Sequence, residues 1–194
     1  MASVQLHLAS SSPRRRDILQ SLGVDFTQSS VYIDESRRPG EIITDVPMRL
    51  ALEKVLALET RESGGVPVLA ADTVVVLKNR VYGKPKSKDD ALSMLSQLSG
   101  RSHAVITAVV LQVGDQVLSA KSHTEVRLRN INLQEADAYW LSGEPADKAG
   151  AYAIQGLGGM FVEAVRGSYS GVVGLPVFET AALLAEAGIQ ILRY

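Results

Sequence analysis

The chain has 194 residues and a mass of 20.8 kDa, with 46% hydrophobic and 21% charged residues. This composition is typical of a globular protein and excludes disordered, collagen-like and low-complexity classes. Twenty basic against 21 acidic side chains give a formal net charge of −1, which argues against general electrostatic binding of nucleic acid. The absence of cysteine excludes disulfides, zinc–cysteine sites, iron–sulfur clusters and thiol nucleophiles.

The first half of the sequence alternates between strand-like and helix-like segments. A short strand over residues 4–9 precedes a helix that Ser12 caps, that begins at Pro13 and that ends at Gly23. The pattern then predicts a strand, a long helix and a second, more apolar strand, at residues 24–32, 44–62 and 66–77. Lys78-Asn79-Arg80 is expected to form the turn after that strand.

The second half predicts a helix, a β-hairpin and two further helices, at residues 87–98, 103–113 with 117–128, 132–141 and 177–187. Because the hairpin interrupts the alternation of strands and helices, the sequence predicts an α/β fold with a mixed β-sheet flanked by helices. Residues 146–174 are rich in glycine but carry too many apolar side chains for a flexible linker. A single domain over residues 1–194 is therefore expected.

Serine and arginine side chains gather where the first strand leads into the first helix, from Ala9 to Arg16. Backbone N–H groups at a helix N-terminus favour anions, and arginine binds phosphate with two parallel hydrogen bonds. Three consecutive arginines oppose the helix dipole there unless an anion or a carboxylate offsets them. The segment is thus either a phosphate site or an ordinary helix cap followed by a solvated basic turn.

Asp72 lies in the middle of an apolar strand pattern, where burial of an unpaired carboxylate is costly. It therefore requires a cation, a metal ion or a cleft nearby, and the simpler alternatives are a structural ion pair or a strand end that faces water. Lys54 falls on the apolar side of its predicted helix, and Lys84 follows the strand that carries Asp72. Each lysine alone is typical of a surface or snorkelling side chain, but with Asp72 they suggest a carboxylate–metal–phosphate site. Glu35, in a polar turn, adds little by itself.

Several familiar catalytic signatures are missing from the sequence. It contains no complete dinucleotide-binding fingerprint, no phosphate-binding loop that ends in Gly-Lys-Ser/Thr, no HExxH and no Gly-x-Ser-x-Gly. Water activated by a metal ion or a carboxylate therefore fits better than a covalent nucleophile.

Five motifs follow one another along the chain, namely LASSSPRRRDILQSLGVDF, IDE, RLALEKV, AADTVV and GKP. In this order and spacing they closely resemble the Maf family of nucleotide pyrophosphatases, and the resemblance covers about residues 8–184. It implies two lobes around a deep cleft, in a fold related to the inosine-triphosphate pyrophosphatases. By position it implies a site with Asp72 as proton acceptor. The other implied members are the catalytic residues Glu35, Lys54 and Lys84 and the phosphate-binding residues Ser10 and Arg15.

Three further positions indicate a branch of that family. Arg14, Thr73 and Gln155 match the residues that mark base specificity in members that hydrolyse dTTP and UTP, whereas the 7-methyl-GTP branch typically has tryptophan in place of Arg14. The implied reaction is attack of water on the α-phosphorus, which gives a nucleoside monophosphate and pyrophosphate and serves to cleanse the nucleotide pool. A further hypothesis is that Glu35 and Asp72 hold Mg²⁺ or Mn²⁺. Two alternatives stay open, a nucleotide-binding regulator of septation linked to arrest of cell division, and the same chemistry on 7-methyl-GTP or a modified pyrimidine nucleotide.

The expected partners are a nucleoside triphosphate and a second copy of the chain, because the family often forms homodimers. No apolar run approaches the roughly 20 residues that a bilayer-spanning helix needs, so no membrane partner is expected. The first 16 residues lack the pattern of a secretory signal, and the chain is expected to be cytoplasmic.

Overall fold

The structure is a computed structural model that describes residues 4–58 and 63–191. Its strands are β1 (Leu6–Ala9), β2 (Phe26–Ser29), β3 (Val68–Leu77), β4 (Arg80–Tyr82), β5 (Ser102–Val113), β6 (Gln116–Leu128) and β7 (Val162–Arg166). Its α-helices are α1 (Pro13–Ser21), α2 (Val46–Ala57), α4 (Lys88–Leu98), α5 (Leu133–Leu141), α6 (Tyr169–Val173) and α7 (Val177–Glu186). Short 3₁₀ turns are η1 (Ile43–Asp45), η2 (Glu144–Asp147), η3 (Ala149–Ala151) and η4 (Leu157–Phe161).

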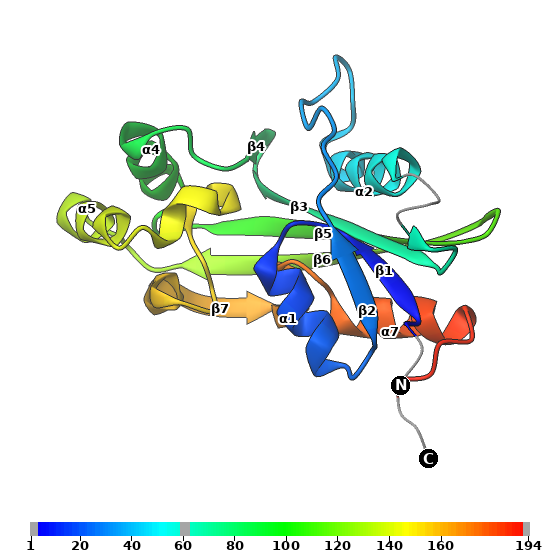
Figure 1. Ribbon diagram of the computed structural model, residues 1–194. Helices are drawn as coiled ribbons and strands as arrows, with labels where there is room; N and C mark the ends of the chain where they lie inside the picture. Colours follow the sequence, from blue (N-terminus) through cyan, green and yellow to red (C-terminus); the bar gives the residue numbers. More distant parts are fainter. Residues whose placement is uncertain (1–3, 59–62, 192–194) are drawn as a thin grey trace. The chain divides into compact units, whose positions relative to one another are not determined.

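The strands form one seven-stranded sheet in the order β2-β1-β3-β5-β6-β7, with β4 paired to β3 (Figure 1). β1 runs parallel to both β2 and β3, whereas the β3–β4 and β6–β7 pairs are antiparallel. The predicted α/β fold with a mixed sheet and flanking helices is confirmed. The expected cleft and the assignment of one domain stay predictions.

The chain divides into two compact units, each assembled from separate stretches of sequence. Unit 1 comprises Met1–Asp72, Thr107–Ser122 and Gly174–Tyr194, and unit 2 comprises Thr73–Ile106 and His123–Val173. The strands β3, β5 and β6 each contribute residues to both units.

Two predicted segments have a boundary that differs from the structure by more than two residues. The strand expected over residues 24–32 is only Phe26–Ser29, because β2 lies at the edge of the sheet and these four residues are the ones that pair with β1. The helix expected over residues 44–62 begins as the turn η1 and continues as α2, which ends at Ala57 because Leu58 adopts an extended backbone. Residues 59–62 lie outside the described part of the chain.

Three elements were missed by the sequence reasoning. Arg80, expected in a turn, begins β4, because Leu77 pairs with Arg80 and leaves Lys78 and Asn79 as a two-residue turn. Lys78 takes a φ of 55°, the left-handed conformation that such hairpin turns require. The glycine-rich stretch 146–174 contains both β7 and α6, short elements whose stability depends on packing and pairing rather than on local propensity.

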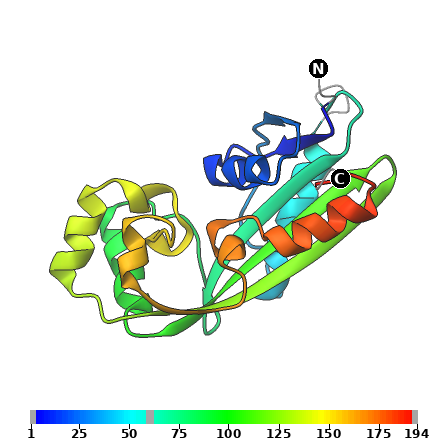
Figure 2. The same ribbon diagram turned by 90° about the horizontal axis from the view of Figure 1, so that it is seen from below.

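The core of unit 1 follows the twofold alternation of its strands. On β3, Leu69 and Ala71 belong to one cluster, which also contains Leu19 of α1 and Leu184 of α7. The intervening residues Val68 and Ala70 belong to the opposite cluster, with Ala51 and Val55 of α2. In unit 1, therefore, α1 and α7 cover one face of the sheet and α2 covers the other (Figures 1 and 2).

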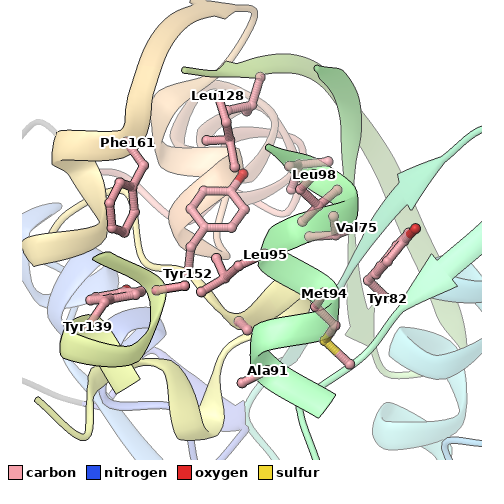
Figure 3. Close-up of a cluster of buried hydrophobic side chains, with 14 residues drawn as sticks. Val75, Tyr82, Ala91, Met94, Leu95, Leu98, Leu128, Tyr139, Tyr152 and Phe161 are labelled. Carbon is pink, nitrogen blue, oxygen red and sulfur yellow. The ribbon is translucent and has the colours of Figure 1, made fainter. Parts of the chain in front are cut away.

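The core of unit 2 is a separate cluster built around α4, α5 and the segment after η2 (Figure 3). Leu95 and Leu98 of α4 pack in it with Phe161, and Tyr139 meets the Phe161 ring edge-on at 5.2 Å between centroids. The cluster also buries Tyr152, whose hydroxyl lies 2.8 Å from Nε2 of His103.

Acidification is expected to destabilise the protein through His103. Burial lowers the pKa of His103 from 6.5 to about 4, so between these values the unfolded chain takes up a proton that the folded protein does not. The stability that the neutral imidazole contributes is complete above the unfolded pKa and is lost as the pH falls through the folded pKa. The total loss of free energy of unfolding is roughly 3 kcal/mol.

Denaturant titrations at about pH 7 and about pH 4 measure this loss of free energy of unfolding. His103→Gln should lose less free energy of unfolding over that interval than the wild type. The control His123→Gln changes an exposed side chain on β6 and should lose as much as the wild type. If His103→Gln and the wild type lose the same free energy of unfolding over this interval, His103 is not the cause of the acid sensitivity.

Candidate active site

The first helix begins where β1 ends, and its N-terminus is capped from within the motif. The Ser12 hydroxyl accepts from the backbone N–H of Arg15, and Pro13 occupies the first turn, where no N–H is needed. The Ser10 side chain is buried, and its hydroxyl accepts from the backbone N–H of Ser12 at 3.2 Å. The predicted helix start at Ser12-Pro13 is confirmed, and it places Ser10 beneath the first turn of α1.

Arg15 is held in a fixed orientation by the surrounding backbone. Its Nε donates to the Gly174 carbonyl at 2.8 Å and its Nη1 to the Ser10 hydroxyl at 3.3 Å. Burial lowers the pKa of the Arg15 guanidinium, while the charge of Asp72 acts in the opposite direction. The side chain stays charged at neutral pH, because arginine does not lose its proton in proteins. A positive charge is therefore fixed close to Asp72.

The alternation of β3 explains where Asp72 points. Val68, Ala70 and Asp72 share one face of the strand, and the first two pack against α2. On α2, Lys54 lies next to the buried Val55, and its ammonium group donates to Asp72 Oδ1 at 2.6 Å. The side chains of Lys54 and Asp72 are only 9% and 10% exposed, so this ion pair is buried. The ion pair with Lys54 meets the expectation that Asp72 has a cation, a metal ion or a cleft nearby, and it is equally the structural ion pair named as the simpler alternative.

Glu35 completes a carboxylate–ammonium–carboxylate arrangement. Its Oε1 lies 2.7 Å from Nζ of Lys54, and its side chain is 52% exposed. The loop that carries Glu35 is attached to α2, because Arg49 donates to the Ser36 carbonyl at 3.0 Å and pairs with Glu41 at 2.5 Å. Sequence reasoning missed Arg49, whose only signal was its position one helical turn before Glu53, with which it also pairs.

Opposing effects set the protonation of Asp72. Burial raises its pKa above the ordinary value, the charges of Lys54 and Arg15 work to lower it, and Glu35 raises it further. The net direction is upward, which makes this carboxylate a stronger base than an exposed aspartate.

The donor set suits a divalent cation that is shared with phosphate. Glu35 and Asp72 each direct one oxygen at the same Lys54 ammonium, so two carboxylates converge on one positive centre. Mg²⁺ is commonly held by one or two carboxylates, with water and substrate phosphates completing its shell. Within residues 4–58 and 63–191, no group of three or more His, Cys, Asp or Glu side chains is placed to hold a metal ion. The two carboxylates therefore fit a metal that the substrate helps to bind.

Of the four remaining predicted site residues, one belongs to unit 1 and three belong to unit 2. Arg14 is half-buried in the first turn of α1, in unit 1. Thr73, Lys84 and Gln155 all belong to unit 2. Thr73 is half-buried on β3, where it follows Asp72 and so points to the opposite face of the strand.

Lys84 and Gln155 are exposed in loops of unit 2. The loop of Lys84 is tied down beside it, because the backbone N–H of Gly150 donates to the Gly83 carbonyl at 3.1 Å. The structure thus brings together five of the predicted residues within unit 1, namely Ser10, Arg15, Glu35, Lys54 and Asp72.

The fold and the site define a globular α/β protein with a buried carboxylate–lysine pair beside a helix N-terminus rich in arginine. The profile of the family described as "Maf-like protein" matches residues 5–187. Proteins called dTTP/UTP pyrophosphatase are 48% identical in Methylococcus capsulatus, covering 98% of this chain and 94% of that protein, and 50% identical in Hahella chejuensis, covering 96% and 94%. A protein of the same name in Chromobacterium violaceum is 48% identical and covers 96% of both chains. This chain belongs to the Maf family.

Among solved structures, the Ham1 protein of Staphylococcus aureus matches 64% of this chain and 71% of its own. The sequences are 14% identical and the TM-score is 0.43, too low a similarity to define the fold on its own. In the part of the chain that the structure describes, no helix has the length and hydropathy needed to cross a bilayer.

Proposed function

We propose that this protein is a nucleotide diphosphatase that hydrolyses the α–β phosphoanhydride bond of dTTP and UTP. The observation that carries the proposal is the buried Asp72–Lys54 pair with Glu35 beside it, in a chain about half identical to proteins named for that activity. The products are the nucleoside monophosphate and pyrophosphate, and the biological role is to cleanse the nucleotide pool.

The residues of unit 1 supply what this hydrolysis requires. Asp72 orients a water molecule and takes its proton as the water oxygen bonds to the α-phosphorus, and the bond from that phosphorus to the α–β bridging oxygen breaks. Lys54 holds the Asp72 carboxylate in place and compensates the charge that builds up on the leaving pyrophosphate. Arg15 and Ser10 bind phosphate oxygens at the N-terminus of α1. Lys84 is assigned to the triphosphate as a further positive charge.

Mg²⁺ or Mn²⁺ would be held by Glu35 and Asp72. When bound, such an ion neutralises phosphate charge and polarises the phosphoryl group. The raised pKa of Asp72 supports its role as proton acceptor, because a stronger base takes a proton from water more readily.

Base selection is assigned to Arg14, Thr73 and Gln155. The Gln155 amide offers a donor and an acceptor to a pyrimidine edge. Arg14→Trp is expected to lower the preference for dTTP and UTP over 7-methyl-GTP by about tenfold, the effect of about 1.4 kcal/mol of lost discrimination. Competition assays with the two substrate types in one vessel measure it, with Arg16→Trp, which alters the exposed neighbour, as the control. Unchanged preference in Arg14→Trp would remove this residue from the specificity site.

A panel of the eight common nucleoside triphosphates plus 7-methyl-GTP, with Mg²⁺ or Mn²⁺, tests the function as a whole. Pyrophosphate release from dTTP and UTP is the expected result. If folded protein releases no pyrophosphate from any nucleotide of the panel, the proposal is contradicted and a nucleotide-binding regulator of septation is favoured.

The proposal includes a homodimer, which the family resemblance implies, and a cytoplasmic location. Light scattering of the purified protein tests the first. A fluorescent fusion expressed from the native locus tests the second.

A further inference from the structure

The segment that carries Gln155 is fastened by one carboxylate. Glu144, in η2, accepts the backbone N–H of Leu157 on Oε2 at 2.8 Å and that of Gly158 on Oε1 at 2.9 Å. Two consecutive backbone donors that converge on one carboxylate fix the local backbone more firmly than a single contact does. Gln155 lies two residues before this anchor, and its own side chain is exposed.

Tyr139 of α5 fastens the same segment from its other end. Its hydroxyl donates to Glu144 Oε1 at 2.6 Å and accepts the backbone N–H of Ala153 at 3.0 Å. Ala153 lies two residues before Gln155. The Tyr139 and Glu144 side chains therefore hydrogen-bond to the backbone on both sides of Gln155. The Tyr139 ring is buried edge-on against Phe161, which fixes the position of its hydroxyl (Figure 3).

Two glycines allow Glu144 and the Ala153 backbone to approach this segment closely. A Cβ on Gly156 would lie 2.6 Å from Cδ of Glu144, and a Cβ on Gly158 would lie 2.9 Å from both the nitrogen and the oxygen of Ala153. These distances are shorter than van der Waals contact. The glycines of the Gly156-Leu157-Gly158 stretch, which complete no dinucleotide fingerprint, are thereby explained by the approach of Glu144 and of the Ala153 backbone.

The electrostatics agree with a permanent carboxylate at this place. Burial works to raise the pKa of Glu144, but the hydrogen bonds from Tyr139, Gly158 and Leu157 outweigh it, and the pKa lies below the ordinary value. An ionised carboxylate only accepts hydrogen bonds, which matches its three donors. Burial and the bond to Glu144 raise the pKa of Tyr139, so its hydroxyl keeps the proton that it donates.

We propose that Glu144 and Tyr139 are positioning residues that hold residues 153–158 in the conformation in which Gln155 presents its amide to the pyrimidine base. This inference rests on the proposed function, because it concerns how that function selects its substrate. Neither residue is assigned to the bond-breaking step, so their loss should weaken binding of the base and leave turnover largely intact.

Steady-state kinetics of Glu144→Gln and Tyr139→Phe on dTTP and UTP test the proposal. Each change should raise KM about tenfold, the loss of one hydrogen bond to a charged group, with kcat within about twofold of the wild type. The controls are Glu163→Gln, an exposed carboxylate on β7 paired with Arg127, and Tyr82→Phe, whose hydroxyl bonds Gln97. Both controls should keep the wild-type KM.

A double-mutant cycle with Gln155→Ala shows whether the effect passes through Gln155. In the Gln155→Ala background, Glu144→Gln should change KM by less than about twofold, because its target is already absent. Amide hydrogen exchange gives a readout that needs no activity, and the Leu157 and Gly158 amides should lose protection in Glu144→Gln.

The outcomes separate a failure of the positioning role from a failure of the proposed hydrolysis. Lost amide protection with an unchanged KM in Glu144→Gln would overturn the positioning role while base reading stands. An equal KM effect with and without Gln155 would overturn it as well. A wild type that cleaves neither dTTP nor UTP would instead contradict the proposed function, whatever the amides show.

Discussion

Asp72→Asn is expected to lower kcat on dTTP and UTP by about 10²–10⁴-fold, the range that a positioned general base supplies. Asparagine keeps the shape of the side chain and can still accept from Lys54 Nζ, so the fold should persist, but the amide cannot take a proton from water. Pyrophosphate release at saturating substrate measures the effect.

The matched control for Asp72→Asn is Asp115→Asn, which removes an exposed carboxylate in the turn between β5 and β6. It should retain the wild-type kcat. If Asp72→Asn turns over within tenfold of the wild type while its circular dichroism is unchanged, Asp72 is not the proton acceptor.

Lys54→Met should damage both stability and catalysis. Methionine fills a similar volume but leaves Asp72 buried without its partner, and such a loss typically destabilises a protein by about 3–5 kcal/mol. The double variant Lys54→Met/Asp72→Asn should recover part of that free energy, because the Asp72 charge that had lost its Lys54 partner is then removed. Denaturant titration of the three proteins measures it.

The pH dependence of Lys54→Met follows from the direction of the Asp72 pKa. Lys54 lowers that pKa, so its removal raises it further, and the folded variant holds a proton on Asp72 to higher pH than the unfolded chain does. The contribution of Asp72 to the stability of the variant should therefore be complete below the unfolded pKa and be lost as the pH rises through the folded pKa. The acid limb of kcat/KM should also move to higher pH.

The control for this pair is Lys121→Gln, which breaks a more exposed ion pair with Asp45 on the surface of unit 1. Such pairs contribute about 0–1 kcal/mol, so its stability should be close to that of the wild type. A Lys54→Met protein as stable as Lys121→Gln at every pH would show that the buried pair does not constrain Asp72.

The site was predictable where a local pattern dictates the direction of a side chain. The period of two in β3 places Asp72 on the same face as Ala70, and the helical period of α2 turns Lys54 toward the core. Both features can be read from a dozen residues of sequence. Their mutual contact then follows from the packing of α2 on that face of the sheet.

Features that depend on contacts between distant parts of the chain could not be predicted from the sequence. The Gly174 carbonyl that orients Arg15 lies 159 residues further along the chain, and no local signal marks it. β7 is a strand because it pairs with β6, although its surroundings are rich in glycine. The length of β2 was likewise set by its partner β1 rather than by its own sequence.

The position of the water oxygen in the products shows which phosphorus atom the water attacks. Hydrolysis of dTTP in H₂¹⁸O with Mg²⁺ or Mn²⁺, followed by mass spectrometry, reveals which product receives the water oxygen. Attack on the α-phosphorus places ¹⁸O in the nucleoside monophosphate and none in the pyrophosphate. Label in pyrophosphate, or release of orthophosphate with a nucleoside diphosphate, would contradict it.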